Sequence, residues 1–193
     1  MILIKLLIAH ILGDFVLQTD KWAKHKQDQK IKSVYLYLHA LVISVLSYLF
    51  VAQWEKIQIL IIIFLTHLLI DIWKVYQKST IKNFIIDQGL HVLILVVIWI
   101  FYFGSELEQM STFILEQDFN KIWLIIFAYI FLIWPTGYII GGITKKWQKE
   151  IDNDGLDKAG MWIGQLERIL TLTFIFLAQF QALGFLIAAK SIL

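Results

Sequence analysis

Long apolar segments recur along the 193-residue chain, and most of them match the length of a helix that crosses a lipid bilayer. Such a helix needs about 20 mostly apolar residues. The composition agrees, because 59% of the residues are hydrophobic, whereas soluble domains average about 45–50%. We therefore expect an all-α, polytopic transmembrane bundle of six or seven helices, which forms a single integral membrane domain over residues 1–193. The expected spans are 1–18, 33–53, 57–76, 81–104, 121–144 and 160–178, followed by a short apolar segment at 180–193.

Two of these segments depart from a simple crossing helix. Pro135 lies inside the fifth span, and because proline interrupts the backbone hydrogen bonds of a helix, it predicts a kink there. Segment 180–193 is short for a full crossing. It is either a tilted seventh helix or a continuation of the sixth.

Lysine is distributed unevenly between the segments that connect the spans. Segments 19–32, 77–82 and 145–159 are rich in Lys, whereas 54–56 and 105–120 contain few Lys residues. Positively charged loops tend to stay on the cytoplasmic side of a membrane. We therefore expect the Lys-rich loops in the cytoplasm and the N-terminus outside, with membrane lipids as the surrounding partners. The formal net charge of +2 gives no indication of nucleic-acid binding.

Three of the apolar spans contain a histidine and an aspartate four residues apart, a spacing that places both side chains on one face of a helix. Spans that run in opposite directions carry the pair in opposite order. In every pair the aspartate is therefore nearer the cytoplasmic end, and the histidine lies one turn deeper. The pairs are His10 with Asp14, His67 with Asp71, and Asp87 with His91.

Three further polar residues enter the same layer of the membrane. His39 lies early in the second span, and Glu167 and Arg168 lie early in the sixth. Ionisable residues inside a membrane are costly and almost always face a bundle interior or a water-filled cavity. We therefore expect these residues and the His–Asp pairs to converge on one polar chamber near the cytoplasmic surface.

Imidazole and carboxylate groups without sulfur fit Zn, Mn or Fe, and the chain has no Cys. We predict a divalent-metal site with either one ion surrounded by further polar residues or two ions that share bridging aspartates. His39 is a further ligand or a proton shuttle. The predicted metal ligands are His10, Asp14, His67, Asp71, Asp87 and His91.

The remaining polar residues of the chamber have predicted roles in a hydrolysis reaction. A metal-bound water becomes a hydroxide nucleophile near neutral pH, and Glu167, together with His39, is the predicted catalytic group for proton transfer. Arg168 is the predicted substrate-binding residue, since a guanidinium binds phosphate or carboxylate through two hydrogen bonds. The leading hypothesis is a membrane-embedded, metal-dependent hydrolase of a lipid-linked or membrane-proximal ester or phosphoester at the cytoplasmic leaflet.

Two other functions use the same residues. Chains of Asp and His also carry protons or ions through transporters and channels, although the outer half of the membrane offers few polar residues to continue such a path. Alternatively, the His–Asp pairs are interhelical hydrogen bonds that hold a non-catalytic scaffold together.

The first four spans also carry a weak internal repeat. Residues 9–14 are similar to 66–71, and the residues that follow His39 are similar to those that follow His91. These similarities suggest two copies of one helical hairpin. The first hairpin would consist of spans one and two, and the second of spans three and four. Two such copies would be related by an axis along the membrane normal.

Several short segments carry polar residues among specific apolar neighbours. These segments are 9–18, 67–71, 87–91, 160–168 and 184–191. Together they resemble a bacterial integral membrane family catalogued as domain of unknown function 3307. The resemblance spans nearly the whole chain and implies a protein of the bacterial cytoplasmic (inner) membrane, with the polar residues above as its site. It implies no particular reaction. The helices with His and Asp are also loosely similar to bacterial inner-membrane proteins described as metal-dependent hydrolases.

Overall fold

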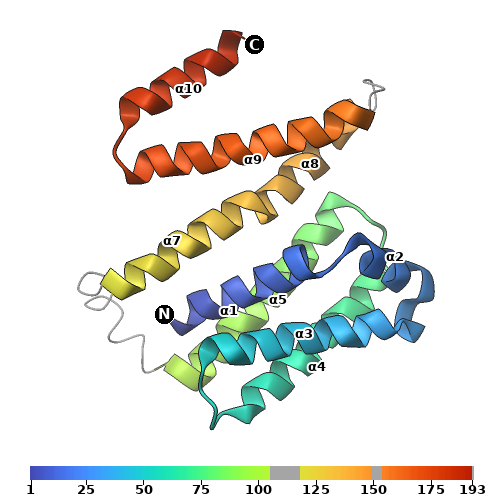
Figure 1. Ribbon diagram of the computed structural model, residues 1–193. Coiled ribbons are helices and arrows are strands. Elements are labelled where there is room, and N and C mark those ends of the chain that lie inside the picture. Colours follow the sequence, from blue (N-terminus) through green and yellow to red (C-terminus); the bar gives the residue numbers. More distant parts are fainter. Residues whose placement is uncertain (105–117, 149–153, 193) are drawn as a thin grey trace. The chain divides into compact units, whose positions relative to one another are not determined.

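The computed structural model describes residues 1–104, 118–148 and 154–192 (Figure 1). These residues contain helices and short connections but no β-strand, which confirms the all-α class for the part of the chain described. Most of loop 105–120 and part of loop 145–159 lie outside the described residues. The helices are α1 (Ile2–Ile11), η1 (Leu12–Leu17), α2 (Asp20–Gln29), η2 (Lys30–Lys32), α3 (Val34–Val51), α4 (Ile57–Val75), α5 (Ile81–Phe103), α7 (Asp118–Ile133), α8 (Pro135–Gln148), α9 (Asp154–Phe176) and α10 (Phe180–Ile192).

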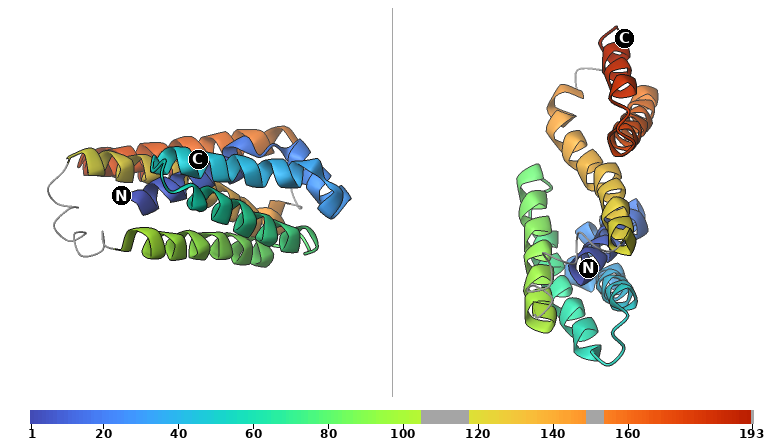
Figure 2. Two further views of the ribbon diagram at one scale, coloured as in Figure 1. Left: turned by 90° about the horizontal axis from the view of Figure 1, so that it is seen from below. Right: turned by 90° about the vertical axis from the view of Figure 1, so that its left-hand side faces the viewer.

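The chain divides into two compact units, Met1–Phe127 and Ala128–Leu193. In the first unit, helices α1, α3, α4 and α5 run side by side (Figure 1 and Figure 2). α1 packs against α3 and α5, and α4 packs against the same two helices. These helices therefore form a closed ring around a shared interior. The expectation of a single domain over the whole chain stays a prediction.

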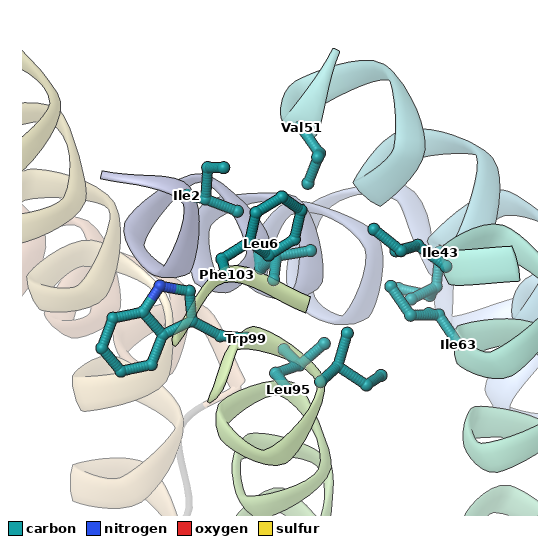
Figure 3. Packing of buried hydrophobic residues seen from close by; sticks show 10 residues of the cluster. Ile2, Leu6, Ile43, Val51, Ile63, Leu95, Trp99 and Phe103 are labelled. Atoms are coloured by element: carbon teal, nitrogen blue, oxygen red, sulfur yellow. The ribbon is translucent and has the colours of Figure 1, made fainter. Parts of the chain in front are cut away.

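Each helix of this ring buries one main stripe of side chains, apolar at one end and polar at the other. In α4 the buried residues fall four apart, from Ile59 through His67 and Asp71 to Val75, which is one face of a helix. Neighbouring helices of the ring run in opposite directions, so their apolar ends meet. They form the core shown in Figure 3, which consists of Ile2, Leu6, Ile43, Val51, Ile59, Ile63, Leu95, Ile98, Trp99 and Phe103.

The first helix approaches α3 very closely at Gly13. This residue belongs to η1, a π-helical segment that continues α1. A Cβ atom at position 13 would lie 1.9 Å from Ile43 Cδ1, closer than two carbon atoms can approach. Any larger residue at position 13 would therefore force either the Ile43 side chain or η1 to shift. The same π-helical segment carries Asp14, and such segments occur frequently at functional sites.

Residues 19–32, expected to connect two spans, are mostly helical. α2 begins where the Thr19 hydroxyl accepts a hydrogen bond from the backbone N–H of Trp22 at 3.4 Å, a usual arrangement at a helix N-terminus. The axis bends by 85° between α1 with η1 and α2 with η2. α2 then packs on α3, where the rings of Trp22 and Tyr35 stack at 5.3 Å. α2 and η2 therefore cover the end of the ring at which the stripes are polar.

The second unit contains the end of α7 and helices α8, α9 and α10. α7 ends at Ile133 and α8 begins at Pro135, which is the interruption that proline predicts in the fifth span. After α9 the chain turns through residues 177–179, with Ala178 at φ 53°. α10 packs back on α9. The alternative that 180–193 continues the sixth span as one helix is therefore wrong.

Within the described residues, helices α3, α4 and α5 and the segment Lys121–Thr144 are long and apolar enough to cross a membrane. α1 with η1 and α2 with η2 pass the same test only as a bent pair, which gives five candidates at most. The expected six or seven spans are not confirmed. The reason lies in the second unit, because α9 carries Glu167 and Arg168 and α10 has 13 residues, fewer than the roughly 20 that a straight crossing needs.

Candidate metal centre

The polar ends of the stripes meet in one buried group of side chains, which we call the His–Asp cluster. None of these side chains is more than 6% exposed. The ring centroids of His67 and His91 lie 4.0 Å apart, and those of His39 and His67 lie 5.0 Å apart. The structure thus brings together all the predicted site residues of the first four spans. The cluster consists of His10, Asp14, His39, His67, Asp71, Asp87 and His91.

Three atoms of the cluster have the spacing of ligands around one metal ion. Asp14 Oδ1 lies 3.2 Å from His39 Nε2 and 3.6 Å from His67 Nε2, and the two nitrogens are 3.1 Å apart. Bonds of about 2.0–2.1 Å around tetrahedral zinc place neighbouring ligand atoms about 3.3–3.4 Å apart. The three measured distances bracket this value, so one ion fits at the centre of the triangle.

The three carboxylates of the cluster share one pattern. The Oδ2 atom of each has a hydrogen-bonding or ionic partner at the edge of the cluster, whereas the Oδ1 atom of each is buried and makes no hydrogen bond among the described residues. Each Oδ1 atom faces imidazole nitrogens. A buried polar atom without a partner costs on the order of 1–3 kcal/mol, and a cation would remove that cost. The Oδ2 partners are Gln88 for Asp14, Lys26 for Asp71, and Lys74 for Asp87.

A second group of atoms lies on the α5 side of the cluster. His91 Nε2 is 3.4 Å from Asp87 Oδ1 and 4.0 Å from Asp71 Oδ1, and this nitrogen also makes no hydrogen bond to any described residue. A cavity of about 10 Å³ lies beside it, lined in part by His10, His67 and His91. A single water molecule needs on the order of 10–15 Å³ by the same measure. The cavity is therefore the size of one water molecule or ion.

Two lysines at the site were not predicted as site residues. Lys26 Nζ donates hydrogen bonds to Asp71 Oδ2 at 2.8 Å and to Gln18 Oε1 at 2.7 Å, and the Lys26 side chain is only 4% exposed. Lys74 Nζ lies 2.5 Å from Asp87 Oδ2. When the imidazoles are neutral, the three aspartate carboxylates and the two lysine ammonium groups together give the site a net charge of −1.

The sequence signal for these lysines was weak. Lys74 follows Asp71 by three residues and thus lies near the polar end of the α4 stripe, which could have marked it. Lys26 had no such signal, because it lies in a Lys-rich segment 45 residues from its partner Asp71. Both were assigned to the positive charge of the cytoplasmic loops.

Gln88 links α1 to α5 inside the cluster and was also missed. Its Oε1 atom lies 3.3 Å from His10 Nε2, and its Nε2 atom donates to Asp14 Oδ2 at 2.9 Å. Since an amide oxygen only accepts, His10 Nε2 is the donor, and His10 Nδ1, 3.9 Å from Asp14 Oδ1, is the nitrogen that can bind a metal. Gln88 therefore orients one histidine and one carboxylate at once, the usual task of residues that surround a metal site.

Glu167 and Arg168 belong to the second unit and have partners there. Glu167 Oε2 accepts a hydrogen bond from Lys190 Nζ at 2.5 Å, and Arg168 Nε donates to the Leu132 carbonyl at 3.0 Å. A Cβ atom at Gly137 would lie 3.1 Å from Arg168 Nη2, so glycine makes room for the guanidinium. The predicted roles of Glu167 and Arg168 in catalysis and substrate binding stay predictions.

One comparison with known proteins gives a match. The sequence profile of the family described as Protein of unknown function (DUF3307) matches residues 2–120, the part of the chain that carries the entire His–Asp cluster. The later segments that resemble the family, 160–168 and 184–191, lie beyond this match. No curated protein and no solved structure matches the chain. The match covers more than half of the 193 residues, and the chain therefore belongs to the DUF3307 family.

Proposed function

We propose that the His–Asp cluster binds a divalent metal ion and that the protein is a membrane-embedded, metal-dependent hydrolase. Its substrate is a lipid-linked or membrane-proximal ester or phosphoester at the cytoplasmic leaflet. The observation that carries this proposal is the pattern of the three carboxylates. Their Oδ2 atoms have hydrogen-bonding or ionic partners, whereas their Oδ1 atoms are buried, make no hydrogen bond among the described residues and face imidazole nitrogens. This arrangement supports a cation at the position where these atoms converge.

The donor atoms favour Zn, Mn or Fe as the ion, because they are nitrogen and oxygen without sulfur. His10, Asp14, His67, Asp71, Asp87 and His91 are the proposed ligands, and the short distances from His39 to Asp14 and His67 support His39 as a further ligand. A bound metal ion of this kind supplies a hydroxide nucleophile, since it lowers the pKa of its water toward about 7.

The two site lysines favour a phosphoester over a neutral carboxylic ester. A divalent ion would change the net charge of the site from −1 to +1. A buried positive charge favours an anionic substrate over a neutral one. Lys26 contacts Asp71 Oδ2, and Lys74 contacts Asp87 Oδ2. The ammonium groups of both lysines therefore lie next to the proposed metal position and can bind phosphoryl oxygens.

The remaining proposed roles are those of Glu167 and Arg168. Glu167 is proposed to transfer a proton during hydrolysis, and Arg168 is proposed to bind the phosphate or carboxylate of the substrate. This assignment predicts that a Glu167→Gln variant keeps its metal but loses hydrolysis.

A transporter or channel receives less support from the fold. The half of the ring opposite the His–Asp cluster is filled by the apolar core of Figure 3, where Leu6 and Ile59 are fully buried. An ion path through the ring would need polar groups in that half. A non-catalytic scaffold explains the helix packing and the His–Asp contacts, but it does not explain why all three Oδ1 atoms are buried without a hydrogen bond.

The same proposal includes the arrangement in the membrane. We place the protein in a bacterial cytoplasmic (inner) membrane, with six or seven spans, the N-terminus outside and the Lys-rich loops inside. The duplicated hairpin of the first four spans belongs to this proposal as well. The uneven distribution of Lys among the loops supports the orientation.

The first test is elemental analysis of the protein purified in detergent without added chelator. About one or two Zn, Mn or Fe ions per chain are expected, and His67→Asn is expected to lose at least one of them. His25→Asn is the matched control, since His25 bonds Ser33 at 2.7 Å and lies outside the cluster. A metal content in the wild type no higher than in His67→Asn would overturn the metal site.

The second test separates hydrolysis from transport. The metal-loaded protein in mixed micelles is expected to release phosphate from lipid phosphoesters, and Lys26→Gln is expected to reduce that release at least tenfold. Lys24→Gln is the control, because Lys24 is an exposed lysine of the same helix. Gradient-driven ion flux in proteoliposomes without any hydrolysis would favour the transporter instead.

A further inference from the structure

We propose that the His–Asp cluster is a two-metal centre in which Asp14 bridges the two ions. This inference rests on the metal site proposed above and adds the number of ions, their positions and the residue they share. It divides the cluster between two adjacent positions, each with its own set of donor atoms.

Two sets of ligand atoms overlap at a single residue. Asp14, His39 and His67 can each offer one atom to a common ion, and so can Asp14, Asp87 and His91, with the atoms of each set within 4.8 Å of one another. His39 and His67 come from α3 and α4, whereas Asp87 and His91 come from α5. Only Asp14 belongs to both sets, and a carboxylate with two oxygens is the usual bridge between metal ions about 3.5–4 Å apart.

One ion cannot account for the whole cluster. Structural and catalytic zinc sites take three or four protein ligands, yet seven ligand-type side chains lie together here with none more than 6% exposed. An ion in the Asp14–His39–His67 triangle would leave Asp87 Oδ1 and His91 Nε2 buried without a hydrogen bond, with only their mutual contact at 3.4 Å. A second ion satisfies both atoms.

The two positions differ in chemistry. The first offers two imidazole nitrogens and one carboxylate oxygen, a set that suits zinc, and the second offers one nitrogen and two carboxylates, which suits Mn better. His10 lies beside the second position, with its ring centroid 5.1 Å from that of His91, and it also shares a possible ligand set with His67 and His91. His10 and Asp71, whose Oδ1 atom lies 4.0 Å from His91 Nε2, are therefore the candidates to complete the second position.

Charge also permits two ions. The two lysines and three aspartates leave the site at −1, so two divalent ions would bring it to +3. A hydroxide ion and the phosphoryl group of a substrate bound at the site would offset most of this charge. Two ions held side by side are a common arrangement for stabilising the attacking and leaving oxygens of a phosphoester.

The test is manganese binding followed by electron paramagnetic resonance of the full-length protein in detergent. Two Mn ions per chain are expected, with a spectrum of two magnetically coupled ions. His39→Gln and the pair Asp87→Asn with Lys74→Met are each expected to bind one ion and to give an uncoupled spectrum. The pair removes a carboxylate together with its lysine, so no buried charge is left unpaired.

A matched control accompanies these variants. Asp28→Asn, which changes an exposed aspartate of α2, should retain two coupled ions. Asp14→Asn should weaken binding at both positions, with the second equivalent at least tenfold weaker, and its helical circular dichroism should match the wild type.

The outcomes distinguish the two proposals. One ion per chain in the wild type would overturn the two-metal centre while leaving the metal site intact. No bound ion would overturn both. Two ions without magnetic coupling, unchanged by Asp14→Asn, would show that they do not share this carboxylate and would overturn the bridge.

Discussion

At residue 13 there is no space for a side chain larger than the hydrogen atom of glycine. The Cβ atom of an alanine would overlap Ile43 Cδ1, and it would also lie 3.1 Å from Ile43 Cγ1. Ile43 is 1% exposed and belongs to the apolar core, so its side chain has little freedom to move away. Because the neighbouring residue is Asp14, any shift of η1 would move a proposed metal ligand.

Gly13→Ala should therefore destabilise the protein and weaken metal binding together. Overpacking of a filled core costs about 1–3 kcal/mol, and we expect a loss of stability in that range in unfolding by sodium dodecyl sulfate. Ile43→Val removes the Cδ1 atom, so the double variant should recover part of the loss. A Gly13→Ala protein as stable as the wild type would show that η1 and α3 are not in such close contact.

At the scale of the helix, the stripe of α4 determines which side chains reach the cluster. Positions 59, 63, 67, 71 and 75 are buried, and the residues between them are partly or fully exposed. Leu69 is 65% exposed. Two positions along a helix correspond to a rotation of about 200°, so residue 69 faces away from the interior of the ring.

The double variant His67→Leu with Leu69→His tests this directly, because it keeps the composition and hydropathy of α4 unchanged. We expect normal helical content and the loss of at least one bound ion per chain, since the imidazole then points out of the ring. The single variant Leu69→His is the control and should retain the wild-type metal content. A wild-type metal content in the double variant would mean that the composition of α4, rather than the position of the histidine, is sufficient.

At the scale of the whole molecule, the distribution of lysine predicts which loops face the cytoplasm. The chain has no Cys, so single-cysteine variants report accessibility without further changes. Glu55 lies between α3 and α4, Lys24 lies in α2, and both are exposed. They lie at opposite ends of the ring.

In intact spheroplasts, a membrane-impermeant maleimide should label Glu55→Cys and leave Lys24→Cys unlabelled. Permeabilised cells should show labelling at both positions. The physical reason is the preference of Lys-rich loops for the cytoplasmic side. Labelling of Lys24→Cys alone in intact spheroplasts would reverse the orientation and move the His–Asp cluster to the outer leaflet.

The grouping of His10, Asp14, His39, His67, Asp71, Asp87 and His91 could be predicted from the sequence. Spacing of four residues defines a face of a helix, and the reversal of order between spans that run in opposite directions defines a depth. Both are local properties. The number of membrane spans was less predictable, because α9 is apolar only in part and α10 is short.

The sequence alone determined that the chain is helical and apolar, and which imidazoles and carboxylates share a layer, because these properties depend on residues within one or two turns of each other. The tertiary structure decided that α2 folds back over the cluster and brings Lys26 to Asp71. It also decided which carboxylate oxygens are paired and which are left facing the imidazoles. These features depend on the 85° bend after η1 and on contacts between residues far apart in the chain, which the periodicity of a single helix does not encode.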